Sequence, residues 1–100
     1  MAHCSVLAVT PTDDGWIPGY LPVASALVAR HGGRYLARTA SHEQIEGAAS
    51  PTGLRIILEW PSREAATAFM NDPEYAPHLA ARSAGADCVH FLIEGRDDLA

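Results

Sequence analysis

The stretch from Leu54 to Ala76 constrains the fold more than any other part of the chain. Leu54 to Trp60 is rich in bulky and β-branched apolar residues and predicts a strand, which Pro61 ends because proline cannot donate to a sheet ladder. Ser62 follows in the position of a helix N-cap. The apolar face of that helix comprises Ala65, Ala66, Phe69 and Met70. The stretch therefore predicts a strand followed at once by an amphipathic helix.

The same stretch also predicts where that helix ends. Asn71-Asp72-Pro73 breaks it, and a second helical piece is expected over Glu74 to Ala84. Three further strands are predicted at Cys4–Thr10, Arg34–Thr39 and Asp87–Ile93.

Between the first two strands the sequence predicts a turn cluster and then a helix. Pro11 to Tyr20 carries prolines, glycines and aspartates that disfavour regular structure. The helical period then runs from Leu21 to Val28, and His31-Gly32-Gly33 marks its end. A connector from Ala40 to Gly53 is rich in small and polar residues, and a short extended piece is expected within it at Gln44–Glu46.

The resulting order is β-α-β-β-α-β, the ferredoxin-like α+β pattern, in a single domain over residues 1–100. Right-handed crossovers give an antiparallel sheet with the strand order 4-1-3-2. Helices cover one face of this sheet, yet three strands carry apolar residues on both faces. Leaving the second face in water costs roughly 25 cal/mol per Å². We therefore expect a homodimer, a dimeric α+β barrel in which a partner sheet covers that face.

Composition narrows the possible functions. The apolar fraction of 48% suits a folded protein, and the net charge of −5 argues against nucleic-acid binding, which needs a basic surface. No apolar run approaches the ~20 residues of a membrane span. Because the N-terminus shows no secretion signal either, the expected location is the cytoplasm.

Several motifs together resemble one known family. They are the run from His31 to Arg38, Glu59-Trp60-Pro61-Ser62 with Glu64-Ala65-Ala66, Asp72-Pro73-Glu74-Tyr75, and Glu94-Gly95. This set is similar to the domain-of-unknown-function family 1330, in the dimeric α+β barrel superfamily. The resemblance implies a small-molecule site between sheet and helices. It implies no single activity, since superfamily relatives include cofactor-independent monooxygenases, lactone isomerases and dehydratases.

Arg38 and Glu59 are the first candidate pair, because they lie on strands expected to be antiparallel neighbours. If the register puts both side chains on one face, Arg38 can clamp a carboxylate or enolate, and Glu59 can act as a base. The alternative is a structural ion pair or two solvated charges. A ligand site would show as a void of a few hundred Å³, on the order of known ligand pockets, with both residues on its wall.

Two histidines are candidates for proton transfer. His31 lies at the end of a helix, where it can serve as a general acid or base at the pocket mouth or simply cap the helix. His90 lies between Val89 and Phe91 in the last strand, so it points away from their face. It projects either into the cavity, as a proton carrier, or into the core or the dimer interface.

Four more residues are candidates for ligand binding. Tyr20 and Tyr75 can donate hydrogen bonds to a ligand or simply pack their rings. Arg82 shares a helix face with Tyr75 and can bind an anion or lie on the surface. Trp16, in the irregular loop, can cover a ligand or anchor the dimer.

The two cysteines do not suggest a disulfide or a metal site. Cys88 and His90 have the spacing of metal ligands, and Cys4 lies on the neighbouring strand. Because those strands should be antiparallel, at about 3.3 Å per residue Cys4 and Cys88 lie too far apart to share a bond or an ion. No cofactor or metal is expected.

The sequence thus favours a homodimer that binds a small, partly apolar organic molecule. Cofactor-independent chemistry on an acidic substrate, by isomerisation, proton transfer or oxygenation, is one hypothesis. A ligand-binding module without turnover and a purely structural dimerisation domain are the others.

Overall fold

The computed structural model describes residues 2–100. Four strands and three helices follow one another in this order: β1 His3–Pro11, α1 Ile17–Arg30, β2 Arg34–Thr39, β3 Leu54–Trp60, α2 Arg63–Met70, α3 Ala76–Gly85 and β4 Ala86–Glu94. This is the predicted β-α-β-β-α-β order, with the second helical segment divided into α2 and α3. None of the helices in this part of the chain has the length and hydropathy of a membrane span.

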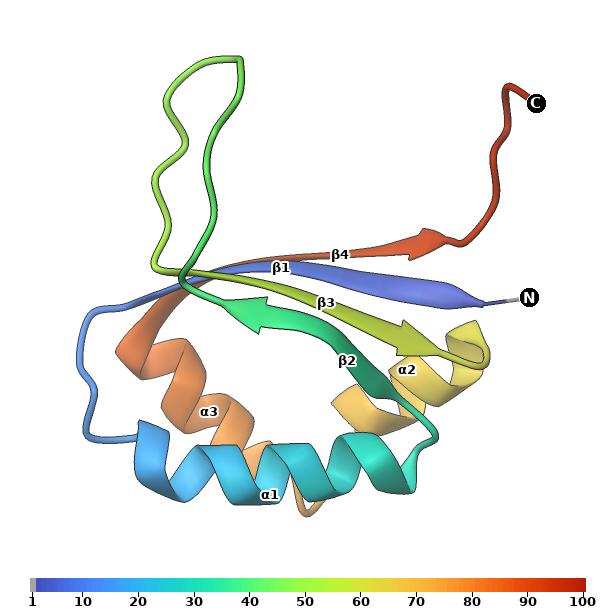
Figure 1. Cartoon of the computed structure of the whole chain (residues 1–100). Helices are drawn as coiled ribbons and strands as arrows, with labels where there is room; N and C mark the ends of the chain where they lie inside the picture. The colour runs from blue at the N-terminus through green and yellow to red at the C-terminus, as the bar shows by residue number, and fades with distance from the viewer. Residues whose placement is uncertain (1) are drawn as a thin grey trace.

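The strands form one antiparallel sheet with the order β2-β3-β1-β4, which confirms the predicted order. All three helices lie against one face of this sheet (Figure 1). The loop between β2 and β3 and the C-terminal segment project on the opposite side (Figure 1). The helix-covered face and the open face therefore have different environments, and strand alternation assigns each residue to one of them.

The core lies between the helices and the covered face. Leu7 and Val9 of β1, Leu27 and Val28 of α1, and Trp60 of β3 are all buried there. An aromatic stack crosses from the sheet to the helices. Its ring centroids are 5.3 Å apart between Trp60 and Phe69 and 4.3 Å apart between Phe69 and Tyr75.

Helix α2 begins as its sequence predicts. The Ser62 hydroxyl accepts a hydrogen bond from the backbone N–H of Ala65 at 3.1 Å, which satisfies one of the free N–H groups at the helix start. Helix α1 also ends as predicted, because Gly32 takes a φ of +80°, a conformation that favours glycine. The second helical piece begins at Ala76 rather than Glu74, since an Asp72 carboxylate oxygen accepts from the Glu74 N–H and holds a turn there.

The predicted turn cluster over Pro11 to Tyr20 is wrong at both of its ends. Pro11 belongs to β1, and α1 already begins at Ile17. Pro18 fits in the first helical turn, where a backbone N–H has no partner in any helix. Pro22 lies inside α1 and removes one backbone hydrogen bond, a loss that the buried residues Ala24, Leu27 and Val28 outweigh by packing on the sheet.

The predicted extended piece at Gln44–Glu46 is also wrong, because no strand forms there. The side-chain amide of Gln44 instead donates to the backbone carbonyls of Glu46, Gly47 and Ala48, at 3.2, 3.0 and 2.8 Å. The loop between β2 and β3 therefore satisfies these three carbonyls locally, through a side chain and not through a sheet ladder.

Candidate functional site

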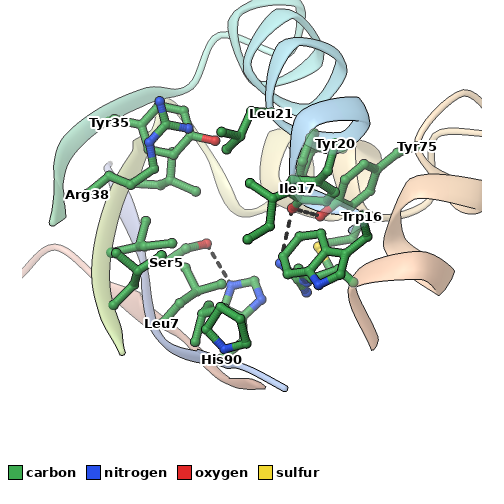
Figure 2. Close-up of a pocket in the computed structure, with 18 of the residues that line it drawn as sticks. Ser5, Leu7, Trp16, Ile17, Tyr20, Leu21, Tyr35, Arg38, Tyr75 and His90 are labelled. Atoms are coloured by element: carbon green, nitrogen blue, oxygen red, sulfur yellow. Dashed lines mark hydrogen bonds between the residues drawn. The ribbon is translucent and has the colours of Figure 1, made fainter. Parts of the chain in front are cut away.

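A pocket lies between the N-terminal half of α1 and the helix-covered face of the sheet (Figure 2). Its volume of about 70 Å³ is smaller than the few hundred Å³ that the sequence led us to expect. It is still several times the ~10–15 Å³ that a single water needs. The wall is largely apolar, and it includes six aromatic rings beside aliphatic side chains: Trp16, Tyr20, Tyr35, Trp60, Phe69 and Tyr75. The polar groups on the wall besides the tyrosine hydroxyls are Ser5, Arg38, Arg82 and His90.

Ser5 and His90 form the first polar cluster in this pocket. The Ser5 hydroxyl is buried and accepts a hydrogen bond from the Trp60 indole N–H at 2.9 Å. The same oxygen lies 2.8 Å from Nε2 of His90 (Figure 2). Burial, reinforced by the positive charge of Arg82, lowers the pKa of His90. The imidazole is therefore neutral at pH 7 and able to accept a proton.

Tyr20, Tyr75 and Arg82 form the second polar cluster. The two tyrosine hydroxyls are 2.6 Å apart (Figure 2), and the Arg82 guanidinium donates to the Tyr20 oxygen at 3.3 Å. Burial raises the pKa of the Tyr75 phenol, so this hydroxyl remains protonated and available as a donor. The cluster brings together residues from α1, from α3 and from the turn before α3.

Trp16 forms one wall of the pocket. Its indole N–H donates to the backbone carbonyl of Gly85 at 3.0 Å, and its ring meets the edge of Tyr20 with centroids 5.1 Å apart. Any side chain at Gly85 would collide with the Trp16 ring, so glycine is required for this close approach. Trp16 is thus fixed between α1 and α3.

Arg38 lies at the mouth of the pocket and remains exposed. Its guanidinium stacks on the Tyr35 ring at 4.0 Å from the centroid (Figure 2) and donates to the Ser25 hydroxyl at 3.3 Å. Burial raises the pKa of Tyr35, which keeps this phenol neutral. Arg38 can therefore reach a ligand from the solvent side.

The structure does not bring Glu59 to Arg38. Tyr35 pairs with Leu58, but a bulge follows, and Arg38 then pairs with Ile56 on the helix-covered face. Glu59 projects from the open face and accepts a hydrogen bond from the Arg34 guanidinium at 2.8 Å. The register before the bulge, if continued, would have put Arg38 and Glu59 on the same face of the sheet. The bulge shifts the pairing by one residue, so the two side chains lie on opposite faces.

His31 also lies outside the pocket. Its Nε2 atom is 2.8 Å from an Asp72 carboxylate oxygen, so it joins the end of α1 to the turn before α3. That hydrogen bond lowers the pKa of Asp72, with a smaller contribution from the charge of Arg30. Of the three candidate catalytic residues, only His90 lines the pocket.

The sequence analysis did not single out Ser5, Tyr35 or Trp60, all of which line the pocket. Ser5 carried a usable signal, because strand alternation puts it on the same face as Leu7 and Val9, where a buried hydroxyl needs a partner.

The cysteines are separated as expected. Cys4 pairs with Ile93 and Cys88 pairs with Val9, so the two cysteines are five strand positions, or about 17 Å, apart.

The lowered pKa of His90 predicts a pH dependence of stability. Below pH 6.5 the unfolded chain takes up a proton at this residue more readily than the folded chain does, so acidification should favour unfolding. We expect the free energy of unfolding to fall between pH 7.5 and pH 5, and to fall less in His90→Asn. Urea titrations at several pH values measure this. Equal slopes for the two proteins over that range would contradict the prediction.

A four-stranded antiparallel sheet with helices on one face and a pocket between the two layers defines a ferredoxin-like α+β protein. The chain belongs to the family described as domain of unknown function DUF1330, whose sequence pattern matches residues 5–96. No protein of curated function matches it in sequence.

Solved structures with the same fold are distant in sequence. The protein of unknown function RPA0582 from Rhodopseudomonas palustris is 16% identical, with a TM-score of 0.81 over 96% of this chain and 83% of its own. SnoaB, a cofactor-independent oxygenase from Streptomyces nogalater, is 19% identical, with a TM-score of 0.65 over 98% of this chain and 96% of its own. An antibiotic biosynthesis monooxygenase is 18% identical, with a TM-score of 0.54 over 97% of this chain and all of its own (100%). At these identities the likeness concerns the fold.

Proposed function

We propose that the protein is a homodimer whose subunits each bind a small, partly apolar, acidic organic molecule in the pocket under α1. The composition of the pocket wall carries this proposal. Aromatic and aliphatic side chains surround two guanidinium groups and one histidine, and among the described residues 2–100 no carboxylate lines the pocket. Such a wall favours a flat apolar body with a negative charge.

The open face of the sheet supports the homodimer. A row of apolar side chains crosses the four strands, since Ala37 pairs with Ile57, Ile57 with Val6, and Val6 with Phe91. Val89 and Ile93 flank Phe91 on the same strand face and are half exposed. A second copy of the chain offers the same apolar surface, so a two-fold pairing of sheets removes both faces from water.

His90 is the residue to which we assign proton transfer, if the bound molecule is turned over. Its neutral imidazole lies beside the pocket and is held by the Ser5 hydroxyl. The chemistry would be isomerisation, proton abstraction or oxygenation without a cofactor. The shared fold of SnoaB, a cofactor-independent oxygenase, supports the last of these.

A binding module without turnover is the second candidate, and one observation favours it. Glu59 and His31 both lie away from the pocket, so His90 is the only one of the three acid–base candidates that lines it. Acid–base catalysis of an isomerisation commonly uses two such groups. A pocket with one base can bind a ligand without converting it.

Ligand binding is tested by NMR titration of the ¹⁵N-labelled protein with benzoate, salicylate and phenylacetate. We expect shifts at the backbone amides of Tyr20, Tyr35 and His90. Leu21→Trp, which replaces an aliphatic side chain on the pocket wall with a bulky indole, should weaken binding about tenfold or more, as expected when one good contact is lost. Glu59→Gln, on the open face, should bind as the unchanged protein does. Shifts confined to residues outside the pocket would refute the proposal.

Turnover is tested separately with phenylpyruvate, an aromatic acid that carries exchangeable carbon-bound protons. If His90 acts as a base, exchange of those protons in D₂O should be faster with the protein than in buffer, and His90→Gln should remove the acceleration. Binding of phenylpyruvate without any acceleration would favour the binding module.

A further inference from the structure

Arg82 is a buried charged residue that has no charged partner in the described part of the chain. Only 8% of its surface is exposed, and it extends from α3 to the pocket wall. Its one hydrogen bond to a side chain goes from Nη1 to the Tyr20 oxygen at 3.3 Å, near the long limit for such a bond. Its Nε atom is buried and has no hydrogen-bond partner.

No charged group of residues 2–100 neutralises Arg82. Across residues 2–100, no carboxylate oxygen lies within 4.0 Å of its guanidinium, whereas Arg30, Arg34 and Arg96 all have such partners. A guanidinium does not lose its proton in proteins, so the charge remains. A buried cation without a counter-ion destabilises the folded state, and a bound anion would offset this loss.

Arg38, the other arginine of the pocket, is in a different situation. It is exposed to water and stacks on Tyr35, so it needs no counter-ion. Arg82 lies deeper, with its guanidinium 6.0 Å from the centre of the Tyr20 ring and bonded to a hydroxyl that is itself 2.6 Å from the Tyr75 hydroxyl. One of these two phenols donates to the other, so an oxygen anion next to Arg82 would also have the remaining phenol O–H within reach as a donor.

We propose that Arg82 and the Tyr20 hydroxyl form the subsite for the ligand's anionic group, so that the pocket selects small carboxylates over neutral molecules of the same shape. This inference rests on the proposed function, because it assumes that the pocket binds a ligand. It assigns the charge recognition to Arg82 rather than to Arg38 at the mouth.

The test compares benzoate with benzamide, which has nearly the same shape and no charge, by isothermal titration calorimetry. The unchanged protein should bind benzoate about ten- to a hundredfold more tightly than benzamide, as expected for a charge-assisted hydrogen bond. Arg82→Met should lose this preference and still bind benzamide. Arg38→Gln, the matched control at the second arginine, should retain most of it.

The outcomes separate the subsite from the pocket. If Arg82→Met keeps the preference for benzoate, the subsite is refuted while the pocket stands. If neither compound binds the unchanged protein, the proposed function fails and the subsite fails with it. If both compounds bind equally well to the unchanged protein, the pocket stands and the charge selection is refuted.

Thermal unfolding gives a readout that does not depend on a ligand. Because methionine removes an unpaired buried charge and leaves an apolar chain, Arg82→Met should melt no lower than the unchanged protein. A marked fall in melting temperature would show that the main role of Arg82 is to stabilise the fold, and it would overturn the proposal. Should the methionine variant fail to fold, Arg82→Gln provides the same loss of charge for the benzoate comparison.

Discussion

Phe91→Asp is expected to yield a monomer of 10.7 kDa under conditions in which we expect the unchanged chain to form a dimer of twice that mass. Phe91 is 65% exposed in the single chain, at the end of the apolar row that crosses the open face. A carboxylate there would lose its hydration when two sheets meet, and two-fold symmetry would bury two of them. The dissociation constant should rise by roughly two orders of magnitude or more, since every 1.4 kcal/mol is tenfold.

Analytical ultracentrifugation over a range of protein concentrations measures this change. Leu99→Asp is the matched control, because Leu99 is 96% exposed in the C-terminal segment and should leave the dimer intact. The helix-covered face is not touched by either substitution, so circular dichroism of the folded monomer should retain its helical signal. A monomeric unchanged protein at micromolar concentration, or a dimeric Phe91→Asp variant, would disprove the pairing through this face.

Trp60→Ala is expected to lower the free energy of unfolding by about 3–5 kcal/mol, the usual cost of deleting a large buried ring. Trp60 is 1% exposed, stacks on Phe69 and donates to Ser5. A typical domain has only about 5–15 kcal/mol of stability in total, so the variant should be largely unfolded at moderate urea concentrations. The loss also releases Ser5, the residue that holds His90.

Urea denaturation at a fixed protein concentration measures this loss, because the stability of a protein that dimerises depends on its concentration. Trp60→Phe separates the contribution of the aromatic ring from that of the indole N–H, because it keeps a ring and removes the donor to Ser5. It should cost less than the alanine variant, roughly 1–3 kcal/mol. Trp16→Ala deletes the same side chain at a half-buried position and should cost less than Trp60→Ala. Equal losses at the two tryptophans would contradict this account of the core.

Much of the fold could be predicted because local signals agree with one another. The apolar runs gave the four strands, Ser62 and Gly32 gave helix ends, and the element order gave the sheet order. The start of α1 was missed, because prolines and glycines that disfavour a helix in isolation are overruled when its later turns pack on a sheet. Local propensity cannot include a contact that forms between distant segments.

The candidate site was predictable only in part. Strand alternation put His90 on the opposite face of its strand from Phe91, and the helical period put Arg82 on the same face as Tyr75. Neighbouring residues along the chain could therefore be assigned to a face. The relation of Arg38 to Glu59 depended on the pairing of two strands and on a bulge that no glycine marks. A one-residue shift reverses the face of a strand residue, which is why Arg38 lies on the helix-covered face while Glu59 projects from the open face.

The order of helices and strands, and the apolar character of both sheet faces, follow from the sequence alone because periodicity and turn chemistry act over a few neighbouring residues. The pocket is a product of the tertiary structure. Ser5 and His90 are hydrogen-bonded although 85 positions separate them in the sequence, and Tyr20 and Arg82 are hydrogen-bonded across 62 positions. These pairs form only when the strand register and the packing of α1 on the sheet bring the residues together.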